Sequence, residues 1–288
     1  MAILLITGAD GQLGSELKLA SKNYYGYDFI FTDIDTLDIT DREKTKAFIK
    51  NSAPDWIINC AAYNQVDKAE NENDKAMLVN ATAVNNIRDA VRGTECRLIH
   101  FSSDYVFNGS SNIPYNEYSD TDPVNAYGRS KLAGEKAALS HHSAVIIRTS
   151  WLYSSHGANF VKTILNKAKK EGSVSVVFDQ VGTPTWSGDL AEAIMQIVAG
   201  VIRNQMAFSP GIYHYSNEGV CSWYDFAEAI IHEAGLACRV LPILTKHYPA
   251  TAKRPSYSVL DKSKIKENYG LEIPHWRSSL KRCIKSLI

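Results

Sequence analysis

The chain has 288 residues, which is enough for one large α/β core with a smaller lobe and too few for three ordinary domains. Apolar residues make up 45% of the sequence and charged residues 22%, so the disordered and fibrous classes are excluded. Lysine plus arginine equals aspartate plus glutamate at 31 each, which argues against recruitment by net charge. We therefore expect a globular protein with neither nucleic acid nor a membrane as its partner.

Five cysteines form an odd number with no CxxC spacing, which favours reduced thiols over a disulfide framework or a zinc site. Residues 1–10 lead into an apolar run without the basic flank and cleavage site of a signal peptide. No run approaches the ~18 consecutive apolar residues of a membrane span. These features predict a cytoplasmic protein without a metal site.

Short β-branched and apolar runs alternate with amphipathic segments along the first part of the chain, as in parallel βαβ units. The expected strands are residues 2–7, 29–32, 56–60, 97–102, 144–148 and 174–178. The expected helices are residues 12–22, 41–51, 74–92, 125–141 and 159–171. This order predicts an α/β fold with a Rossmann-type, doubly wound parallel sheet.

After residue 178 the elements become shorter, and the loops become rich in Pro, Ser and Tyr. Helices are expected at residues 187–202, 222–234 and 276–288. We place a nucleotide-binding Rossmann domain at residues 1–178 and a smaller C-terminal α/β substrate lobe mainly at residues 179–288. The boundary is approximate, and the two parts are allowed to interleave.

The first expected strand leads into the first helix through a glycine-rich turn, Gly8-Ala9-Asp10-Gly11-Gln12-Leu13-Gly14. Glycine lets the backbone turn sharply and approach a pyrophosphate, whose charge is met by the amides at the start of the helix. Turns are rich in glycine in any case, but this position between strand and helix matches the dinucleotide fingerprint. The residues of this turn assigned to cofactor binding are Gly8, Gly11, Gln12, Leu13 and Gly14.

Acidic residues follow the second expected strand. Asp33 lies 19 residues after Gly14, where a carboxylate can accept hydrogen bonds from the adenosine ribose hydroxyls. The alternative role of Asp33 is to cap a turn or a helix. Asp38 and Ile39 either line the adenine pocket or cap the helix that is expected from residue 41.

The ends of the third and fourth expected strands carry further candidates. Ala61, Ala62 and Tyr63 belong to a segment whose small residues would let the chain pass close to a cofactor, and they equally suit helix–sheet packing. Ser103 and Asp104 place a hydroxyl and a carboxylate at the carboxyl edge of the sheet. Ligands of open α/β sheets bind at that edge.

Tyr127 and Lys131 are four residues apart in an expected helix, so a phenol and an ammonium share one face. A phenol has a pKa of ~10, and a nearby positive charge favours the ionised form and lowers that pKa. Such a tyrosine can donate a proton to a ketone that receives hydride. The spacing alone is usually a surface pair, but the glycine turn and the serine at the strand end favour a reductase centre.

Several segments together carry a family resemblance: the glycine turn and residues 103–107, 126–135, 148–153, 179–185 and 254–255. On these segments the chain resembles the dTDP-4-dehydrorhamnose reductases, a family of extended short-chain dehydrogenases, nearly from end to end. The resemblance implies reduction of the 4-keto group of dTDP-6-deoxy-L-lyxo-4-hexulose to dTDP-L-rhamnose. It implies NADH or NADPH as the cofactor and a dTDP-sugar as the bound partner.

The resemblance also implies roles for individual residues. Ser103 would hydrogen-bond the substrate carbonyl, Tyr127 would donate the proton, and Lys131 would hold the nicotinamide ribose and tune Tyr127. Trp151 offers a broad apolar face with one donor, and its alternative is a place in the core. The residues assigned to substrate binding are Ser103, Asp104, Trp151 and Arg254.

The chain departs from the family pattern at Ser103 and Asn64, where threonine is usual, and neither change removes a required functional group. Some members bridge subunits through magnesium, for which Glu16 is the only match, so no metal is assigned and both a monomer and a homodimer stay open. A nucleotide-sugar epimerase or dehydratase is an alternative, although dehydratases need an acidic pair where this chain has Ser103 and Asp104. A non-catalytic regulatory subunit is another, against which the intact Ser103, Tyr127 and Lys131 argue.

Overall fold

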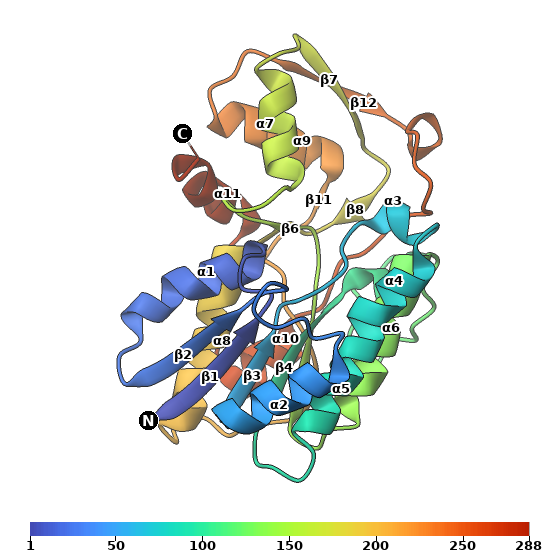
Figure 1. Cartoon of the computed structure of the whole chain (residues 1–288). Coiled ribbons are helices and arrows are strands. Elements are labelled where there is room, and N and C mark those ends of the chain that lie inside the picture. Colours follow the sequence, from blue (N-terminus) through green and yellow to red (C-terminus); the bar gives the residue numbers. More distant parts are fainter. Residues whose placement is uncertain (288) are drawn as a thin grey trace.

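A computed structural model describes residues 1–287, in which the largest sheet has six strands, all parallel (Figure 1). In spatial order these strands are β10 (Gly211–His214), β5 (Ala144–Thr149), β4 (Arg97–Ser103), β3 (Trp56–Asn59), β1 (Ala2–Thr7) and β2 (Tyr27–Thr32). The order reverses between β1 and β3, which is the switch point at which doubly wound sheets bind ligands. The predicted fold class is confirmed.

Helices cover both faces of this sheet. Successive residues of a strand point to opposite faces, so neighbouring residues of one strand pack against different helices. Leu4 and Ile6 of β1 pack in a core with the helices α1 (Gln12–Ala20) and α8 (Ser187–Ile202). Leu5, between them, packs on the other face with α2 (Arg42–Ser52), α5 (Ala83–Ala90) and α6 (Ala126–Leu139). Two buried faces explain why the strands read as continuous apolar runs rather than as alternating ones.

The expected helix over residues 74–92 is interrupted. It consists of α4 (Asn73–Met77), a π-helical turn η2 (Leu78–Thr82) and α5. The Asn80 carboxamide lies in this turn, accepts from the Tyr63 N–H at 2.8 Å and donates to the Ser130 hydroxyl at 2.8 Å. The π turn therefore brings a buried amide between the loop after β3 and α6, a frequent use of such turns near functional sites.

The prediction that residues 174–178 form the sixth strand of the large sheet is wrong. They form β7 (Ser173–Val177), which pairs in parallel with β12 (Arg239–Ile243) in a separate two-stranded sheet. The edge place beside β5 is taken by β10. An apolar, β-branched run reports that a strand forms, but its partner is chosen by long-range packing that composition does not encode.

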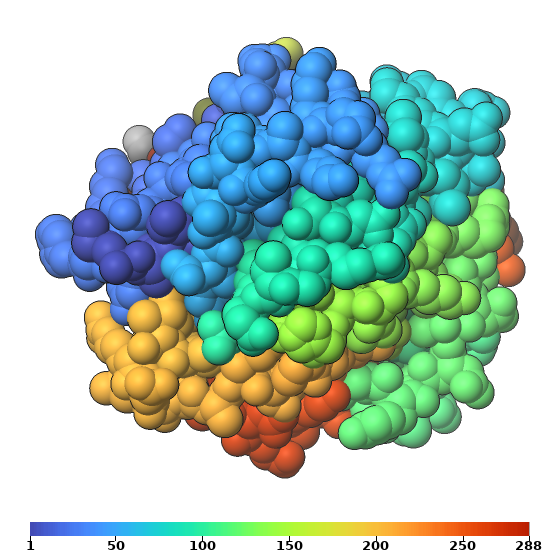
Figure 2. Space-filling view, turned by 60° about the horizontal axis from the view of Figure 1, so that its bottom comes forward, coloured from blue at the N-terminus to red at the C-terminus, as the bar shows by residue number. Residues whose placement is uncertain are grey.

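A second apolar cluster lies beyond the carboxyl edge of the large sheet (Figure 1). It joins α7 (Phe160–Ala168), β7, α9 (Trp223–Glu233), β12 and α11 (Trp276–Lys285). Segments of the two cores alternate along the chain. The helix α7 precedes residue 178 and packs in the second cluster, whereas α8 follows residue 178 and packs in the first. In Figure 2 the gold segment near residue 200 accordingly lies beside the blue N-terminal segment. The boundary at residue 178 stays a prediction.

The remaining elements are short. They are η1 (Ser21–Asn23), α3 (Val66–Ala69), η3 (Asp104–Val106), β6 (Leu152–Tyr153), β8 (Val181–Gly182), β9 (Thr185–Trp186), β11 (Cys221–Ser222), η4 (Thr245–His247) and α10 (Ser263–Tyr269). Within residues 1–287, no helix has the length and apolar character that crossing a membrane requires.

Candidate active site

The carboxyl ends of β1, β3, β4 and β5 open into a cleft of about 1040 Å³ that residues of the second apolar cluster also line. Nearly all the predicted site residues lie around it. These are Gly8, Gly11, Gln12, Leu13, Asp33, Asp38, Ile39, Ala61, Ala62, Tyr63, Ser103, Asp104, Tyr127, Lys131, Trp151 and Arg254. Residues that were predicted for the site from separate parts of the sequence therefore line one cleft in the structure.

Gly14 is the exception, since it is buried and does not line the cleft. A Cβ atom there would overlap the backbone of Gly8 and Ala9, so this glycine lets α1 pack closely under the turn. Gly8 itself has a left-handed φ of 66°, and a Cβ on it would lie 2.5 Å from the Ala61 nitrogen. Only glycine therefore allows the ends of β1 and β3 to approach in this way.

The start of α1 offers donors toward the cleft. Its N-cap residue is Gly11, which has no side chain to cap the first amides of the helix. Uncapped amides and the positive end of the helix dipole together form an anion-binding site. The turn thus suits the pyrophosphate of a dinucleotide.

Asp33 both lines the cleft and holds the glycine turn in place. Its Oδ2 accepts from the Asp10 N–H at 2.9 Å, and its Oδ1 accepts from the Ile34 N–H at 2.8 Å. Asp38 likewise lines the cleft while its Oδ1 accepts from the N–H and hydroxyl of Thr40 at 2.9 and 2.7 Å. Asp38 caps this turn, whereas the N-cap of α2 is Asp41. The alternative in which Asp38 caps the helix after residue 40 is therefore wrong, because Asp41 takes that place, and cofactor contacts of Asp33 and Asp38 stay a prediction.

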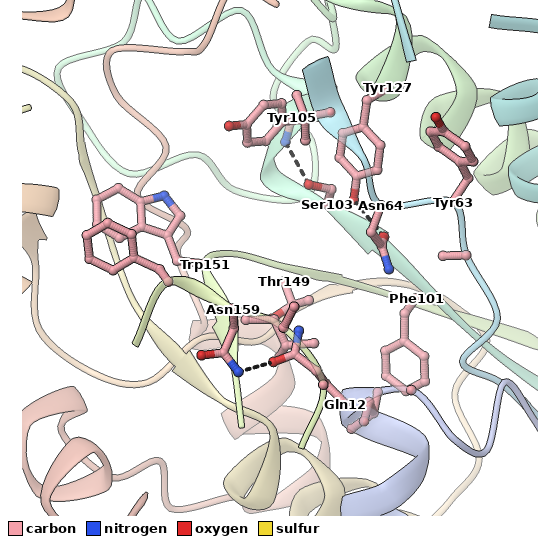
Figure 3. A pocket seen from close by; sticks show the side chains of 18 of the residues that line it. Gln12, Tyr63, Asn64, Phe101, Ser103, Tyr105, Tyr127, Thr149, Trp151 and Asn159 are labelled. Carbon is pink, nitrogen blue, oxygen red and sulfur yellow. Dashed lines mark hydrogen bonds between the residues drawn. The ribbon is translucent and has the colours of Figure 1, made fainter. Parts of the chain in front are cut away.

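Ser103 and Tyr127 meet at the floor of the cleft (Figure 3). Asn125 caps α6 by accepting from the Gly128 N–H at 2.7 Å, which places Tyr127 in the first turn of the helix. The Tyr127 ring packs edge-on against Tyr105 with a centroid distance of 5.5 Å, and its hydroxyl lies 3.5 Å from Asn64 Oδ1. The phenol is 9% exposed and faces the cleft.

The prediction that Lys131 lowers the pKa of Tyr127 is wrong for this structure. The Lys131 ammonium donates to the Phe101 carbonyl oxygen at 2.6 Å, so its charge is turned toward β4. Burial raises the pKa of the Tyr127 phenol, and a hydrogen bond with Ser103 only partly opposes this. At neutral pH the phenol therefore keeps its proton, which is the form that a proton donor needs.

Burial also shifts the pKa values of Lys131 and Asp104, the titratable neighbours of Tyr127 and Ser103. It lowers the pKa of Lys131 to about 8, with the Glu135 carboxylate acting in the opposite direction. It raises the pKa of Asp104 to about 7. Ser103 Oγ donates to Asp104 Oδ1 at 3.0 Å and accepts from the Tyr105 N–H at 3.2 Å. The serine hydroxyl is thus oriented from both sides.

The sequence matches the family described as "RmlD substrate binding domain" over residues 1–288. The chain belongs to this family. It is 40% identical to the dTDP-4-dehydrorhamnose reductase of Aggregatibacter actinomycetemcomitans, over 98% of this chain and 98% of that relative. It is also 40% identical to the spore coat polysaccharide biosynthesis protein SpsK of Bacillus subtilis, over 99% and 98%.

Solved structures of the RmlD family have the same fold. The dTDP-4-dehydrorhamnose reductase of Bacillus anthracis, in complex with NADP, superposes with a TM-score of 0.92 at 38% identity, covering 99% of this chain and 100% of that one. A solved dTDP-glucose 4,6-dehydratase of Streptomyces venezuelae also superposes, with a TM-score of 0.78, but at 17% identity this likeness shows the fold alone. The predicted family resemblance is confirmed.

In this RmlD family member, Trp151 belongs to an aromatic wall of the cleft. Its backbone is left-handed, with a φ of 47°, which is rare for a bulky residue. Its indole stacks on that of Trp223 at 3.6 Å between centroids and an angle of 7°. The ring is half-buried: it lines the cleft and packs against the second cluster, and its contact with substrate stays a prediction. Trp223 was not predicted, because an aromatic residue on the apolar face of a helix is usually core.

Further residues of the cleft escaped the sequence prediction. Asn159 Nδ2 donates to Gln12 Oε1 at 3.0 Å and so joins the start of α7 to the glycine turn (Figure 3). Thr163 and Lys167, on the side of α7, and Tyr248, which lies near Arg254, also line the cleft. They are isolated polar residues in helices and loops, and no local pattern distinguishes them from surface positions.

Arg254 lines the cleft and is held by an acidic partner. Its guanidinium forms a two-pronged ion pair with Asp67, with Nη2 to Oδ2 at 2.6 Å and Nη1 to Oδ1 at 3.1 Å. Glu16, the residue considered for magnesium, accepts from the Ser154 hydroxyl at 2.6 Å. Within residues 1–287, no group of three or more His, Cys, Asp or Glu side chains is arranged to hold a metal ion. The absence of a metal stays an expectation.

Proposed function

We propose that the protein reduces the 4-keto group of dTDP-6-deoxy-L-lyxo-4-hexulose to dTDP-L-rhamnose with NADH or NADPH. Family membership and the dTDP-4-dehydrorhamnose reductases among its relatives support this assignment. The single observation that carries it is the buried, protonated Tyr127 beside Ser103 at the floor of a cleft that begins at a dinucleotide turn. Ketone reduction needs a donor at that point.

The residues around the turn fit a nicotinamide dinucleotide. The uncapped amides of α1 suit the pyrophosphate, and Asp33 suits the adenosine ribose. Ala61, Ala62 and Tyr63 border the same part of the cleft. When bound, the reduced cofactor supplies the hydride that the protein itself cannot supply.

Three side chains then act on the substrate and on the cofactor ribose. Ser103 turns its hydroxyl proton from Asp104 Oδ1 to the ketone oxygen, and Tyr127 transfers its own proton to that oxygen as negative charge develops there. Lys131 holds the ribose hydroxyls of the nicotinamide and compensates the charge left on the phenolate. This requires the ammonium to turn from the Phe101 carbonyl toward the ribose, a short rearrangement within the cleft.

The sugar nucleotide is held by the opposite walls of the cleft. The indole of Trp151 offers a flat apolar face to the sugar or the base, and Arg254 offers a planar cation to the diphosphate. Asp104 accepts from the Ser103 hydroxyl in this structure, and the substrate ketone takes its place as the acceptor. The protein acts in the cytoplasm under this proposal, a compartment whose reducing conditions agree with its five free cysteines.

The test is oxidation of NADH or NADPH by the purified protein in the presence of the keto-sugar nucleotide, with dTDP-L-rhamnose identified as the product. An epimerase would release an epimerised sugar without net oxidation of added cofactor, and a dehydratase would act on dTDP-glucose. A regulatory subunit would give no turnover with either substrate. A sedimentation measurement on the same sample distinguishes a monomer from a homodimer.

A further inference from the structure

The short helix α3 and the turn after it carry two carboxylates that reach different walls of the cleft. Asp67 accepts four hydrogen bonds from the segment 251–254. The backbone amides of Thr251 and Ala252 donate at 3.1 and 3.0 Å, and the Arg254 guanidinium donates from two nitrogens at 3.1 and 2.6 Å. One side chain therefore holds both the backbone and the cation of this segment.

Glu70, three residues further along, holds the start of α6. Its Oε1 accepts from the Ala126 N–H at 2.7 Å. That amide belongs to the first turn of the helix, where backbone donors have no partner within the helix. Ala126 directly precedes Tyr127, so Glu70 is one residue away from the phenol in the chain.

A third contact joins the start of α6 to the segment 251–254. Asn125, the N-cap of α6, donates from Nδ2 to the Lys253 carbonyl oxygen at 2.8 Å. The segment 251–254, the start of α6 and α3 are thus joined pairwise, over separations of up to 187 positions in the sequence. The three parts meet at the place where Arg254 and Tyr127 both face the cleft.

We propose that Asp67 and Glu70 are positioning residues that set the substrate-binding arginine and the proton donor against each other. Asp67 aims the Arg254 guanidinium at the diphosphate of the sugar nucleotide, and Glu70 sets the depth of Tyr127 through the Ala126 amide. The inference rests on the proposed function, since it concerns the same cleft. It assigns work to residues that contact neither substrate nor cofactor themselves.

The energetics favour a geometric role over a merely stabilising one. The Asp67 side chain is 44% exposed, and ion pairs at such sites contribute little to stability because water screens them. A two-pronged arginine–carboxylate pair nevertheless fixes the plane of the guanidinium. Arginine recognises a diphosphate in the same planar way, so its orientation decides how well the anion is bound.

The first test uses Asp67→Asn, which keeps an oxygen for the two backbone amides but removes the charge that holds Arg254. Binding of dTDP, measured by calorimetry, should weaken by about tenfold, the effect of losing a charge-assisted hydrogen bond. KM for the keto-sugar nucleotide should rise in parallel, while kcat and NADPH binding should stay near the wild-type values. The matched control is Asp89→Asn, because Asp89 pairs with arginines 42, 88 and 92 outside the cleft.

The second test separates Glu70 from Asp67. Glu70→Ala should lower kcat and leave dTDP binding unchanged, since only the start of α6 loses its partner. Glu70→Gln, which keeps an acceptor oxygen, should recover most of the lost kcat. If Glu70→Ala does not fold, Glu70→Asp takes its place, because the shorter side chain withdraws the acceptor from Ala126.

Failure of the positioning roles can be distinguished from failure of the proposed function. If the wild-type protein does not turn over the keto-sugar nucleotide, the proposed function fails, and the dTDP titration of Asp67→Asn still tests the inference. If the wild type is active and Asp67→Asn binds dTDP as tightly as Asp89→Asn does, the role of Asp67 is refuted. If Asp67→Asn and Glu70→Ala both raise KM and lower kcat to a similar extent, the division of roles is refuted and a common structural defect is indicated.

Discussion

Replacement of Tyr127 by phenylalanine gives the sharpest test of the catalytic arrangement. The change deletes the hydroxyl and keeps the ring, whose edge-on packing against Tyr105 is unaffected. The developing charge on the substrate oxygen then loses its proton donor. We expect kcat to fall by ~10² to 10⁴-fold, the range for a lost general acid.

The structure predicts that this loss has almost no counterpart in stability. The Tyr127 hydroxyl is 3.5 Å from Asn64, at the limit of a hydrogen bond, and its other partner, Ser103, keeps its hydrogen bonds with Asp104 and with the Tyr105 N–H when the hydroxyl is removed. The expected loss of transition-state stabilisation is about 2.7 to 5.4 kcal/mol, at 1.36 kcal/mol for each factor of ten. The free energy of unfolding should change by well under ~1 kcal/mol, because a net hydrogen bond contributes only about that much.

Tyr213→Phe is the matched control. Tyr213 is fully buried in β10, donates to the Ser209 carbonyl oxygen at 2.9 Å and accepts from the Asn268 amide at 2.9 Å. Loss of this hydroxyl removes both hydrogen bonds and should destabilise the protein by about 1 to 3 kcal/mol while kcat stays unchanged. The two substitutions therefore should produce opposite patterns.

The assay combines steady-state oxidation of NADPH with thermal and urea unfolding of each variant. KM for NADPH and binding of dTDP serve as checks that Tyr127→Phe keeps an intact cleft. Near-normal turnover by Tyr127→Phe on a verified keto-sugar nucleotide would refute the assignment of Tyr127 and favour the regulatory-subunit alternative.

Further predictions concern the cofactor, the aromatic wall and the buried lysine. The Asp33 carboxylate should disfavour the charge of a 2′-phosphate, so NADH should serve at least as well as NADPH, and a kcat/KM more than about tenfold higher for NADPH would contradict this. Trp151→Ala should raise KM for the sugar nucleotide and also lower the melting temperature, because the indole stacks on Trp223; unchanged KM would assign it to packing alone. Lys131 loses its proton as pH rises through its pKa of about 8, so kcat/KM of the free enzyme should fall above that pH. Since this pKa is lowered on folding, the unfolded chain binds more protons between about 8 and 10.5, and the contribution of Lys131 makes the protein more stable as pH rises through that window, as pH-dependent unfolding can check.

Features that depend on neighbouring residues could be predicted from the sequence. Strand segments followed from apolar runs, the first turn of α1 from its glycines, and the shared face of Tyr127 and Lys131 from helical spacing. Such patterns are readable because backbone conformation and side-chain periodicity are set within a few residues. The candidate cofactor turn and Tyr127 were predicted from these patterns, and the proposed roles of Ser103 and Lys131 from the family resemblance as well.

Only the tertiary structure decided which segments meet. It placed β10 rather than β7 beside β5, buried Gly14 below the cleft, and turned Lys131 toward the Phe101 carbonyl. The ion pair of Asp67 with Arg254 joins positions 187 apart in the sequence, and the residues around neither position predict it. Such contacts depend on the packing of the whole chain and on desolvation, which raises the pKa of Tyr127 although the helical spacing to Lys131 predicted a lowered one.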